Sequence, residues 1–507
     1  MAKLYLFAVG GTGTRVLKSL TMLLASGVHI NVDEIVPMII DTDINNGDLE
    51  KYRRIHNEYA LINKSCYMDL SKDSFKNHFF RTKIAKPKEI SLSGTSFGNL
   101  MEMIDYNGLN ASGQSETKLL VDLLFSDEVL KMKLEKGFMG NPNIGSIVLK
   151  HVIDSQGFKD FTLDFNSGDR IFIVSSIFGG TGAAGFPLLL KLFRSNQSNM
   201  NNIGFINNAI IGATTVLPYF EVDVTKFQSG ESQTNSDTFI TKTKAALTYY
   251  DQHVGNLINA LYYIGDTLKS NYENNDGGED QKNPSNFIEL AAALSIVDFM
   301  KYERAAQNID ELSKPVRYFE FGVDADLETF SFKNLPSDDK LFQHQLSSFA
   351  YFSVYMSNFL KNSLYHSNLV WRNELMITPQ FANSDFVSAL VNFCNKHFYN
   401  YLIELAYSKH GRRFIPLKLR FENVNYDKIE ELTEPISPLI TLDSLFEIIN
   451  EVPAKRNGSF FKKDAIKFDQ IASSLAVNRQ EALSGSTELK FMDLFNRTVS
   501  QIINERF

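Results

Sequence analysis

The chain has 507 residues, of which 44% are hydrophobic and 22% are charged, and its formal net charge is −8. This is the composition of an ordinary globular protein of roughly two to four domains, and the acidic balance argues against a general nucleic-acid binder, because neutralising phosphates needs a surplus of Lys and Arg. The two cysteines, Cys66 and Cys394, exclude a disulfide framework or a CxxC metal site and fit a cytoplasmic protein.

The first predicted element is a strand, KLYLFAV at residues 3–9, which meets glycines too soon to be a signal peptide. The glycine turn after it contains Gly10, Gly11 and Gly13. An amphipathic helix follows, and its apolar face consists of Val16, Leu17, Leu20 and Leu24. The turn lacks the GK[ST] ending of a P-loop, and Val16 stands where a dinucleotide fingerprint has its third glycine, so neither motif is complete.

The segment IFIVSSIFGGTGAAGFPLLLKLF, at 171–193, repeats this arrangement. The serines and glycines in its middle argue against a membrane span, where irregular backbone would leave polar groups unpaired. We predict instead a buried parallel strand, a second glycine turn, and a helix with Pro187 in its first turn. The glycines of the second turn are Gly179, Gly180, Gly182 and Gly185.

A glycine turn between a strand and a helix brings bare N–H groups and a helix dipole together, and these can bind an anion. One such turn is more often only a tight connection, but two within the first ~190 residues predict two loops that hold one polyphosphate. Hydroxyl donors can come from Thr12, Thr14 and Thr181. Arg15 either faces the phosphate or is an exposed residue of the first helical turn.

The sequence FGGTGAAG, at 178–185, closely resembles the signature loop of the tubulin/FtsZ superfamily. Four more segments resemble superfamily motifs in the same chain order: AVGGTGTRV the first glycine loop, VPMIIDTDINNGDLE the second-strand motif, NASGQSETKLL the third loop, and AIIGATTVLPYFEV the fifth loop. The resemblance covers about the first 310 residues. GFMGNPNIGSIVLK and the chain length are closer to a divergent bacterial tubulin-like branch than to FtsZ itself.

This resemblance implies an α/β fold with a Rossmann-type nucleotide-binding sheet, a long central helix and an α+β C-terminal domain. The implied parts are a GTP-binding domain at 1–285, the central helix with a catalytic loop at 286–311, and the C-terminal domain at 312–507. The implied cofactors are GTP or GDP, with Mg²⁺. The second-strand motif matches at Asp41, Thr42 and Asp43, while Pro218, Phe220 and Glu221 form a ribose-contacting fifth loop that is one residue more compact than in FtsZ.

The implied nucleotide contacts are Gly10, Gly11, Thr12, Gly13, Thr14, Asp41, Asp43, Gly113, Gln114, Gly179, Gly180, Thr181, Gly182, Ala183, Pro218, Glu221 and Asn286. Of these, Gly113 and Gln114 would lie near the terminal phosphate. Asn286 would read the guanine edge at the start of the central helix; it is equally a natural helix cap, and Asn283 or Ser285 are alternatives.

The superfamily places acidic residues at the far end of the central helix, where they reach the nucleotide of the next subunit. The matching segment QNIDELS gives the candidate catalytic residues Asn308, Asp310 and Glu311. The third acidic position of the FtsZ pattern is Ser313 here, so hydrolysis could be weakened, and NIDEL also reads as an ordinary helix terminus. After it, VRYFEF is predicted to be a strand.

The resemblance therefore implies a GTPase that assembles head-to-tail with copies of itself and hydrolyses GTP between subunits. The alternative is a non-hydrolysing nucleotide-binding scaffold that recruits an unknown protein through its C-terminal region. A dinucleotide oxidoreductase that uses only the first turn is a distant third. His397 and Cys394, three residues apart, make no metal site alone. The basic segment 410–420 reads as an edge strand, and the aromatic stretch within 342–366 as a helix of the core.

Overall fold

The computed structural model describes most of the chain. The described residues are 2–43, 45–68, 75–91, 98–111, 115–134, 138, 141–195, 200–223, 237–267, 270–273, 278–279, 281–301, 316–322, 327–331, 340–365, 368–406, 412–415, 464–478 and 485–504.

A seven-stranded parallel sheet forms the centre of the molecule, in the order β3-β2-β1-β4-β5-β7-β9. Its strands are β1 (Lys3–Val9), β2 (Glu34–Asp41), β3 (Lys88–Ser91), β4 (Arg170–Ser176), β5 (Ile210–Val216), β7 (Ala260–Ile264) and β9 (Arg317–Phe321). If these seven strands are numbered by their order in the chain, the third strand lies at one edge of the sheet, followed by the second, the first, and then the fourth to the seventh. This is the strand order of doubly wound nucleotide-binding sheets. The expected α/β fold is confirmed, and β9 confirms the strand predicted at VRYFEF.

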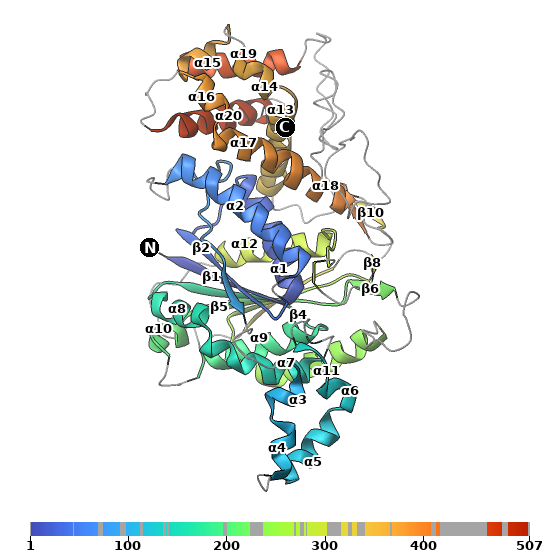
Figure 1. The fold of residues 1–507 in the computed structure, drawn as a ribbon. Helices are drawn as coiled ribbons and strands as arrows, with labels where there is room; N and C mark the ends of the chain where they lie inside the picture. The colour runs from blue at the N-terminus through green and yellow to red at the C-terminus, as the bar shows by residue number, and fades with distance from the viewer. Residues whose placement is uncertain are drawn as a thin grey trace.

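Helices cover both faces of the sheet (Figure 1). The upper face carries α1 (Gly10–Ala25), α2 (Gly47–Tyr67) and α12 (Phe287–Lys301). The lower face carries α7 (Pro142–Val148), α8 (Gln156–Asp164), α9 (Gly180–Phe193), α10 (Ile203–Asn207) and α11 (Asp237–His253), with the 3-10 turn η2 (Leu149–Asp154) between α7 and α8. Both faces are therefore buried, which explains the continuous apolar strands.

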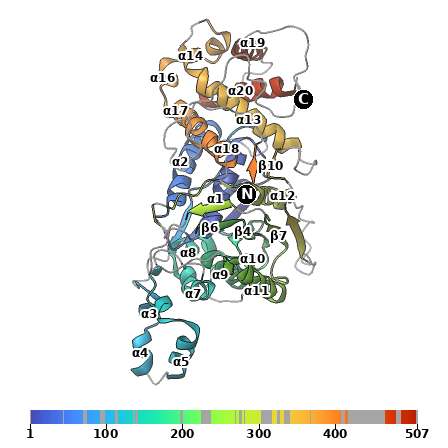
Figure 2. The ribbon, with the colours of Figure 1, turned by 90° about the vertical axis from the view of Figure 1, so that its right-hand side faces the viewer.

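A small helical arm projects from the lower layer, and Figures 1 and 2 show it extending away from the body. It consists of α3 (Leu100–Met103), α4 (Tyr106–Ala111), α5 (Ser115–Leu124) and α6 (Asp127–Leu130). Four leucines of α5 are more than half exposed: Leu119, Leu120, Leu123 and Leu124.

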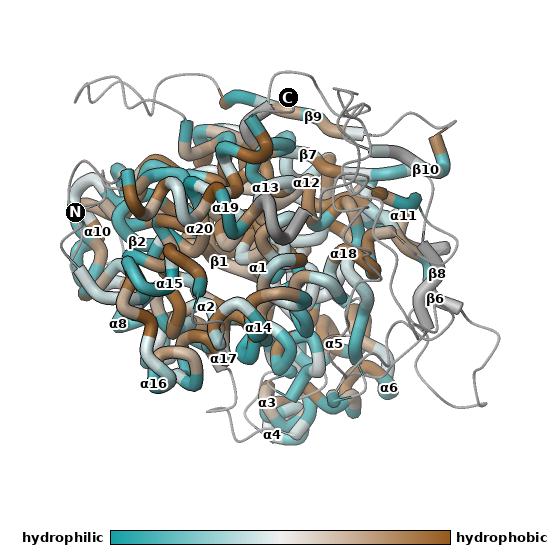
Figure 3. The backbone as a smooth tube through the Cα atoms, turned by 90° about the horizontal axis from the view of Figure 1, so that it is seen from above, coloured by the Kyte–Doolittle hydropathy of each residue, from teal (hydrophilic) through white to brown (hydrophobic). Residues whose placement is uncertain are grey.

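A layer of helices from the C-terminal part of the chain lies above α1 and α2 (Figure 1). We call it the C-terminal layer, and it contains α13 (Lys340–Asn358), α14 (Leu360–Tyr365), α15 (Val370–Glu374), α16 (Pro379–Ala382), α17 (Asp385–Asn392), the π-helix η5 (Phe393–Phe398), α18 (Tyr399–Ala406), α19 (Asp464–Val477) and α20 (Thr487–Asn504). Viewed from above in Figure 3, α20 lies with α13 and α19, on which it packs. The predicted aromatic core helix is confirmed in α13, where Phe349, Phe352 and Tyr355 are buried.

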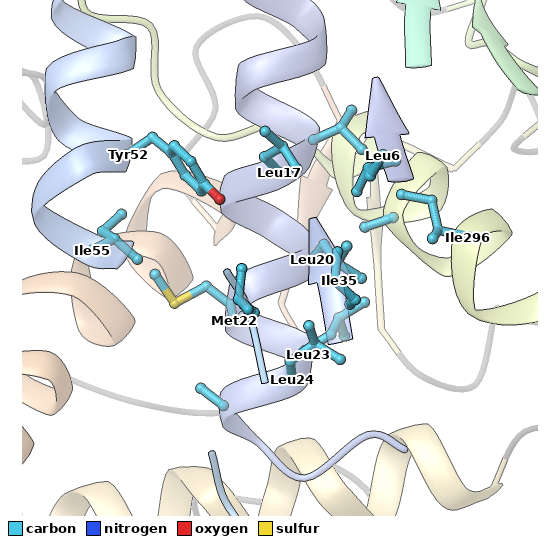
Figure 4. Close-up of a cluster of buried hydrophobic side chains, with 14 of the residues drawn as sticks. Leu6, Leu17, Leu20, Met22, Leu23, Leu24, Ile35, Tyr52, Ile55 and Ile296 are labelled. Atoms are coloured by element: carbon cyan, nitrogen blue, oxygen red, sulfur yellow. The ribbon is translucent and has the colours of Figure 1, made fainter. Parts of the chain in front are cut away.

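Helix α1 has the predicted apolar face, with Val16, Leu17, Leu20 and Leu24 buried, but its polar positions are buried as well. All its residues are buried except Gly11, which is partly exposed. The sheet lies below it, α2 and α12 lie beside it, and the C-terminal layer lies above. Figure 4 shows the apolar contacts of α1 with Leu6, Ile35, Tyr52, Ile55 and Ile296. Polar residues of α1 are thus forced into the interior, where each charge needs a partner.

Two local predictions need correction, and a third is confirmed. Helix α9 begins at Gly180, straight after the extended residue Gly179, so Pro187 lies inside the helix and its missing N–H removes one helical hydrogen bond. The tract expected to be only a loop after β7 contains β8 (Ser270–Glu273), which pairs with β6 (Phe220–Asp223). The edge strand expected in the basic segment is present as β11 (Arg413–Phe414), which pairs with β10 (Thr329–Phe330) in a two-stranded sheet. Arg412 before it is buried against Asp266 at 2.7 Å and is not solvated.

Candidate functional site

The two glycine turns meet at one point of the sheet. They follow β1 and β4, which are neighbours, and their helices leave to opposite faces, α1 upward and α9 downward (Figure 1). A Cβ atom added at Gly10 would lie 3.4 Å from Cβ of Thr181 and 3.7 Å from N of Gly182, so the turns are in contact. This is the topological switch point of the sheet, where open α/β folds bind ligands.

Glycine is required at these turns for steric reasons. Gly10 has φ +73°, which other L-residues rarely adopt. A Cβ at Gly182 would lie 2.7 Å from the carbonyl oxygen of Ser176, and a Cβ at Gly13 would lie 2.6 Å from the carbonyl carbon of Ala8. The backbone of each helix therefore packs directly on the end of its strand, and this places the first helical turns at the sheet edge.

The first turns of α1 and α9 have the properties of an anion site. In this described part of the chain, neither helix has an acidic residue in its first turn or a side-chain cap on its N-terminus. The first N–H groups of a helix have no partner within the helix, and the helix dipole adds positive potential there. Two such ends converge at the switch point, so the main chain can hold several phosphate oxygens without lysines.

The end of β2 borders the first turn. The pairing of Val9 with Ile40 places Asp41 beside Gly10. Asp41 Oδ1 accepts from the Asp43 amide at 3.2 Å, and Asp43 Oδ2 accepts from Gly278 N at 2.6 Å. Burial raises the pKa of the Asp41 carboxyl to about 7, and the neighbouring Asp43 charge adds to this rise, while hydrogen bonds from the Asp43 and Thr42 amides and the charge of Arg15 oppose it.

The raised pKa of Asp41 predicts a stability change with pH. Because the folded state binds this proton more tightly than the unfolded state, the contribution is full below pH ~4 and is lost as pH rises through about 7. We expect Asp41→Asn to flatten the slope of unfolding free energy between those pH values, measured by urea denaturation at a series of pH values. An unchanged slope in the variant would show that Asp41 does not titrate there.

Arg15 is not an exposed residue of the first helical turn, so that alternative from the sequence is wrong. The other alternative, that Arg15 faces the phosphate, stays a prediction. Its side chain is buried. Its Nε donates to Glu289 Oε1 at 2.6 Å and its Nη1 to Asp48 Oδ2 at 3.1 Å. Its Nη2 donates to Tyr219 Oη at 3.0 Å and to Thr12 Oγ1 at 3.2 Å. The carboxylates of Asp48 and Glu289 neutralise this cation, so its charge is balanced within the protein.

Asn286 is buried at the start of α12, and its Oδ1 accepts from Ile288 N at 2.9 Å. This is the helix-cap geometry weighed from the sequence, and it engages the side-chain oxygen. A role in reading the base stays a prediction for its remaining atoms.

The connection after β5 lies against the second glycine turn. Phe178 contacts Phe220 and Tyr219 with ring centroids 5.3 Å and 6.3 Å apart. Pro218 is partly buried there and Glu221 is exposed. The structure thus brings the two glycine turns, the end of the second-strand motif and the predicted fifth loop to one edge of the sheet. Thr14, Gly180 and Gly182 are buried, and Gly179 and Thr181 are partly exposed.

Five predicted site residues lie outside the described residues: Gly113, Gln114, Asn308, Asp310 and Glu311. Within the described ranges, no cluster of three or more His, Cys, Asp or Glu side chains could hold a metal ion. A Mg²⁺ that binds mainly to phosphates and water needs only one or two carboxylates, and Asp41 lies at the level of Gly10 in the first turn.

The sequence analysis missed the carboxylates that surround Arg15 and its neighbours. Asp48, Glu289 and Glu404 are almost fully buried. No local pattern marks them, because their partners lie up to 386 residues away in the chain. The only signal was indirect: Arg15 and Lys18 fall within a helix whose neighbours are apolar, and buried cations need buried anions.

Comparison with known proteins gives likenesses in structure and none in sequence. No family model matches the chain, and no curated protein matches it by sequence. Among solved structures, "CetZ from Methanosaeta thermophila strain DSM 6194" matches with 13% identity and a TM-score of 0.25, covering 62% of this chain and 58% of that one. "CetZ2 from Haloferax volcanii - GTPgS bound protofilament" matches with 13% identity and a TM-score of 0.28, covering 59% of this chain and 58% of that one. The chain thus spans less than two thirds of each neighbour. None of the helices that the structure describes has the length and hydropathy of a membrane span.

Proposed function

We propose that this protein binds GTP at the two glycine turns. The observation that carries the proposal is the contact between Gly10 and Thr181–Gly182, at the switch point of the sheet. Two uncapped helix N-termini converge on that point. A triphosphate carries several negative charges, and convergent main-chain N–H groups suit it. The choice of guanine as the base rests on the resemblance of FGGTGAAG to the tubulin/FtsZ signature loop.

The residues of the turns would hold the phosphates and those after β2 and β5 would border the nucleoside. Asp41, at the level of Gly10, would be the carboxylate available to a phosphate-bound Mg²⁺. Mg²⁺ would supply charge neutralisation at the phosphates, as it does in other phosphoryl-transfer sites. The chain's own contribution is to fix the position of the phosphates, because such reactions depend mostly on positioning and electrostatics.

We further propose that copies of the chain assemble head-to-tail, with Asp310 or Glu311 of one copy completing the site of the next. Contacts of this kind that do not close on themselves produce filaments. The competing proposal is a scaffold that binds nucleotide and assembles without useful hydrolysis, and the substitution of Ser313 for an acid favours it.

Light scattering and phosphate release, measured together on the full chain, test these proposals. With GTP and Mg²⁺ we expect both signals, with ATP and GDP as comparisons. Asp310→Ala combined with Glu311→Ala should abolish release while GTP binding persists. Scattering without release, already in the unmodified chain, would favour the scaffold. Absence of GTP binding by calorimetry would overturn the proposal as a whole.

A further inference from the structure

Residues 283–286, with the sequence Asn-Pro-Ser-Asn, are held by three buried carboxylates from three different helices. We call them the NPSN segment. Each of its main-chain N–H groups donates to one carboxylate, and Pro284 has none to donate. The bonds join Asn283 N to Asp48 Oδ1 at 2.9 Å, Ser285 N to Glu404 Oε2 at 2.9 Å, and Asn286 N to Glu289 Oε2 at 3.1 Å.

The same three carboxylates pair with three cations of α1 and α2. Arg15 contacts Asp48 and Glu289, as described above. Glu404 contacts Lys18 Nζ at 3.3 Å and also Lys51 Nζ. The cluster therefore holds three positive and three negative charges and is neutral. Charge-assisted hydrogen bonds in a buried cluster are strong, and each missing member leaves a costly unpaired charge.

The NPSN segment lies beside the glycine turn. The Arg15 side chain spans the gap: its Nη2 contacts Thr12 Oγ1 in the turn, while its Nε contacts Glu289, which holds Asn286. Asn283 Nδ2 also donates to Asp48 Oδ2, at 3.1 Å, at the start of the helix that follows β2. A ligand anchored by phosphates in the turn, and longer than the phosphates, would therefore meet this segment.

Glu404 is the member of the cluster that comes from the C-terminal layer. It lies on α18 and is 3% exposed. Besides the Ser285 amide, it accepts from Ser285 Oγ at 2.5 Å. Burial alone would raise the pKa of Glu404, but Lys18, Lys51 and the Ser285 hydroxyl lower it to about 2. Both carboxylate oxygens are thus occupied and charged.

We propose that Glu404 is a positioning residue for nucleoside recognition. Through Ser285 it holds the NPSN segment in place, and this segment forms the wall of the site that contacts the nucleoside when the phosphates of a nucleotide bind at the glycine turns. The inference rests on the proposed function, because it takes the phosphates to bind at the glycine turns. It makes the C-terminal layer a part of the nucleotide site even though Glu404 itself need not touch the ligand.

The proposal predicts that loss of Glu404 affects the binding of one ligand and not of another. Tripolyphosphate needs only the glycine turns, whereas GTP also needs the nucleoside wall. Loosening the wall should therefore weaken GTP binding and spare tripolyphosphate binding. General loosening of the fold would weaken both.

We would measure the Kd of both ligands by calorimetry in the full chain. Glu404→Gln keeps the side-chain shape but removes the charge, and Ser285→Ala removes only the hydroxyl bond. We expect Glu404→Gln to weaken GTP binding about tenfold, the equivalent of one charge-assisted hydrogen bond, and to change tripolyphosphate binding less than about twofold. Ser285→Ala should shift the ratio of the two Kd values in the same direction, and Ser285→Thr should restore it.

Leu402→Ala is the matched control, since Leu402 is a buried residue of the same helix outside the cluster. It should lower the melting temperature and leave the ratio of the two Kd values unchanged. An equal loss for both ligands in Glu404→Gln, or no loss in either cluster variant, would overturn the positioning role. If Glu404→Gln fails to fold, Ser285→Ala decides alone. Failure of the unmodified chain to bind either ligand would instead overturn the proposed function.

Discussion

Gly182→Ala is expected to weaken GTP binding by about 100-fold, the loss of roughly two charge-assisted hydrogen bonds. The added Cβ would lie 2.7 Å from O and 2.8 Å from N of Ser176, and both are backbone atoms that cannot rotate away. The first turn of α9 must therefore move off the end of β4. Its N–H groups would then no longer converge with those of α1. Calorimetry with GTP measures the effect.

Gly204→Ala is the matched control for this experiment. A Cβ at Gly204 meets nothing within 4 Å, and the residue lies in α10, at the lower face of the sheet. The same chemical change there should leave GTP binding unaltered. If Gly182→Ala binds GTP as tightly as this control, the second glycine turn is not part of the phosphate site.

Arg15→Met should be the most destabilising single change in the buried charge cluster, at about 3–5 kcal/mol, the usual cost of removing one partner of a buried ion pair. It would leave Glu289 and Asp48 without their cation, although both are almost fully buried. Methionine fills much of the same volume, so the loss is electrostatic. Urea unfolding at pH 7 would measure the change.

Arg53→Met provides the comparison for Arg15→Met. Arg53 also pairs with two carboxylates, Glu50 and Glu89, but its side chain is 28% exposed and theirs are 45% and 32% exposed. Exposed pairs contribute about 0–1 kcal/mol, so Arg53→Met should change stability little. If the two variants lost the same free energy of unfolding, burial would not strengthen the ion pairs of Arg15.

The parallel sheet was predictable because its signals are local. Strands β1 and β4 are short apolar runs that end in glycines, and each glycine turn leads into a helix, so the sequence alone placed both turns at strand ends. The start of α9 was misjudged for an equally local reason: glycines and Pro187 usually mark the limits of a helix, but here close packing on Ser176 extends the helix back to Gly180.

The surroundings of the turn were not predictable from the sequence. Arg15 adjoins the glycines, and its sequence neighbours do not reveal that Glu289 will reach it from α12. The expectation that Arg15 binds phosphate rested on its position next to the glycines of the first turn in the sequence. Asn286 shows the opposite case, since a cap at the start of α12 depends only on nearby residues and was among the alternatives considered.

The buried charge cluster also sets an order of events during synthesis. Lys18 lies 386 residues before Glu404, and Arg15 lies 274 residues before Glu289. Domains generally fold as they emerge, starting from the N-terminal side. When the helix that leaves the first glycine turn has been made, Lys18 still lacks its anion, and Arg15 can soon pair with Asp48 but not yet with Glu289. The edge of the sheet that carries the glycine turns therefore reaches its final form only after α18 has left the ribosome. A nascent chain that stops before α18 retains Lys18 and Lys51 without their carboxylate.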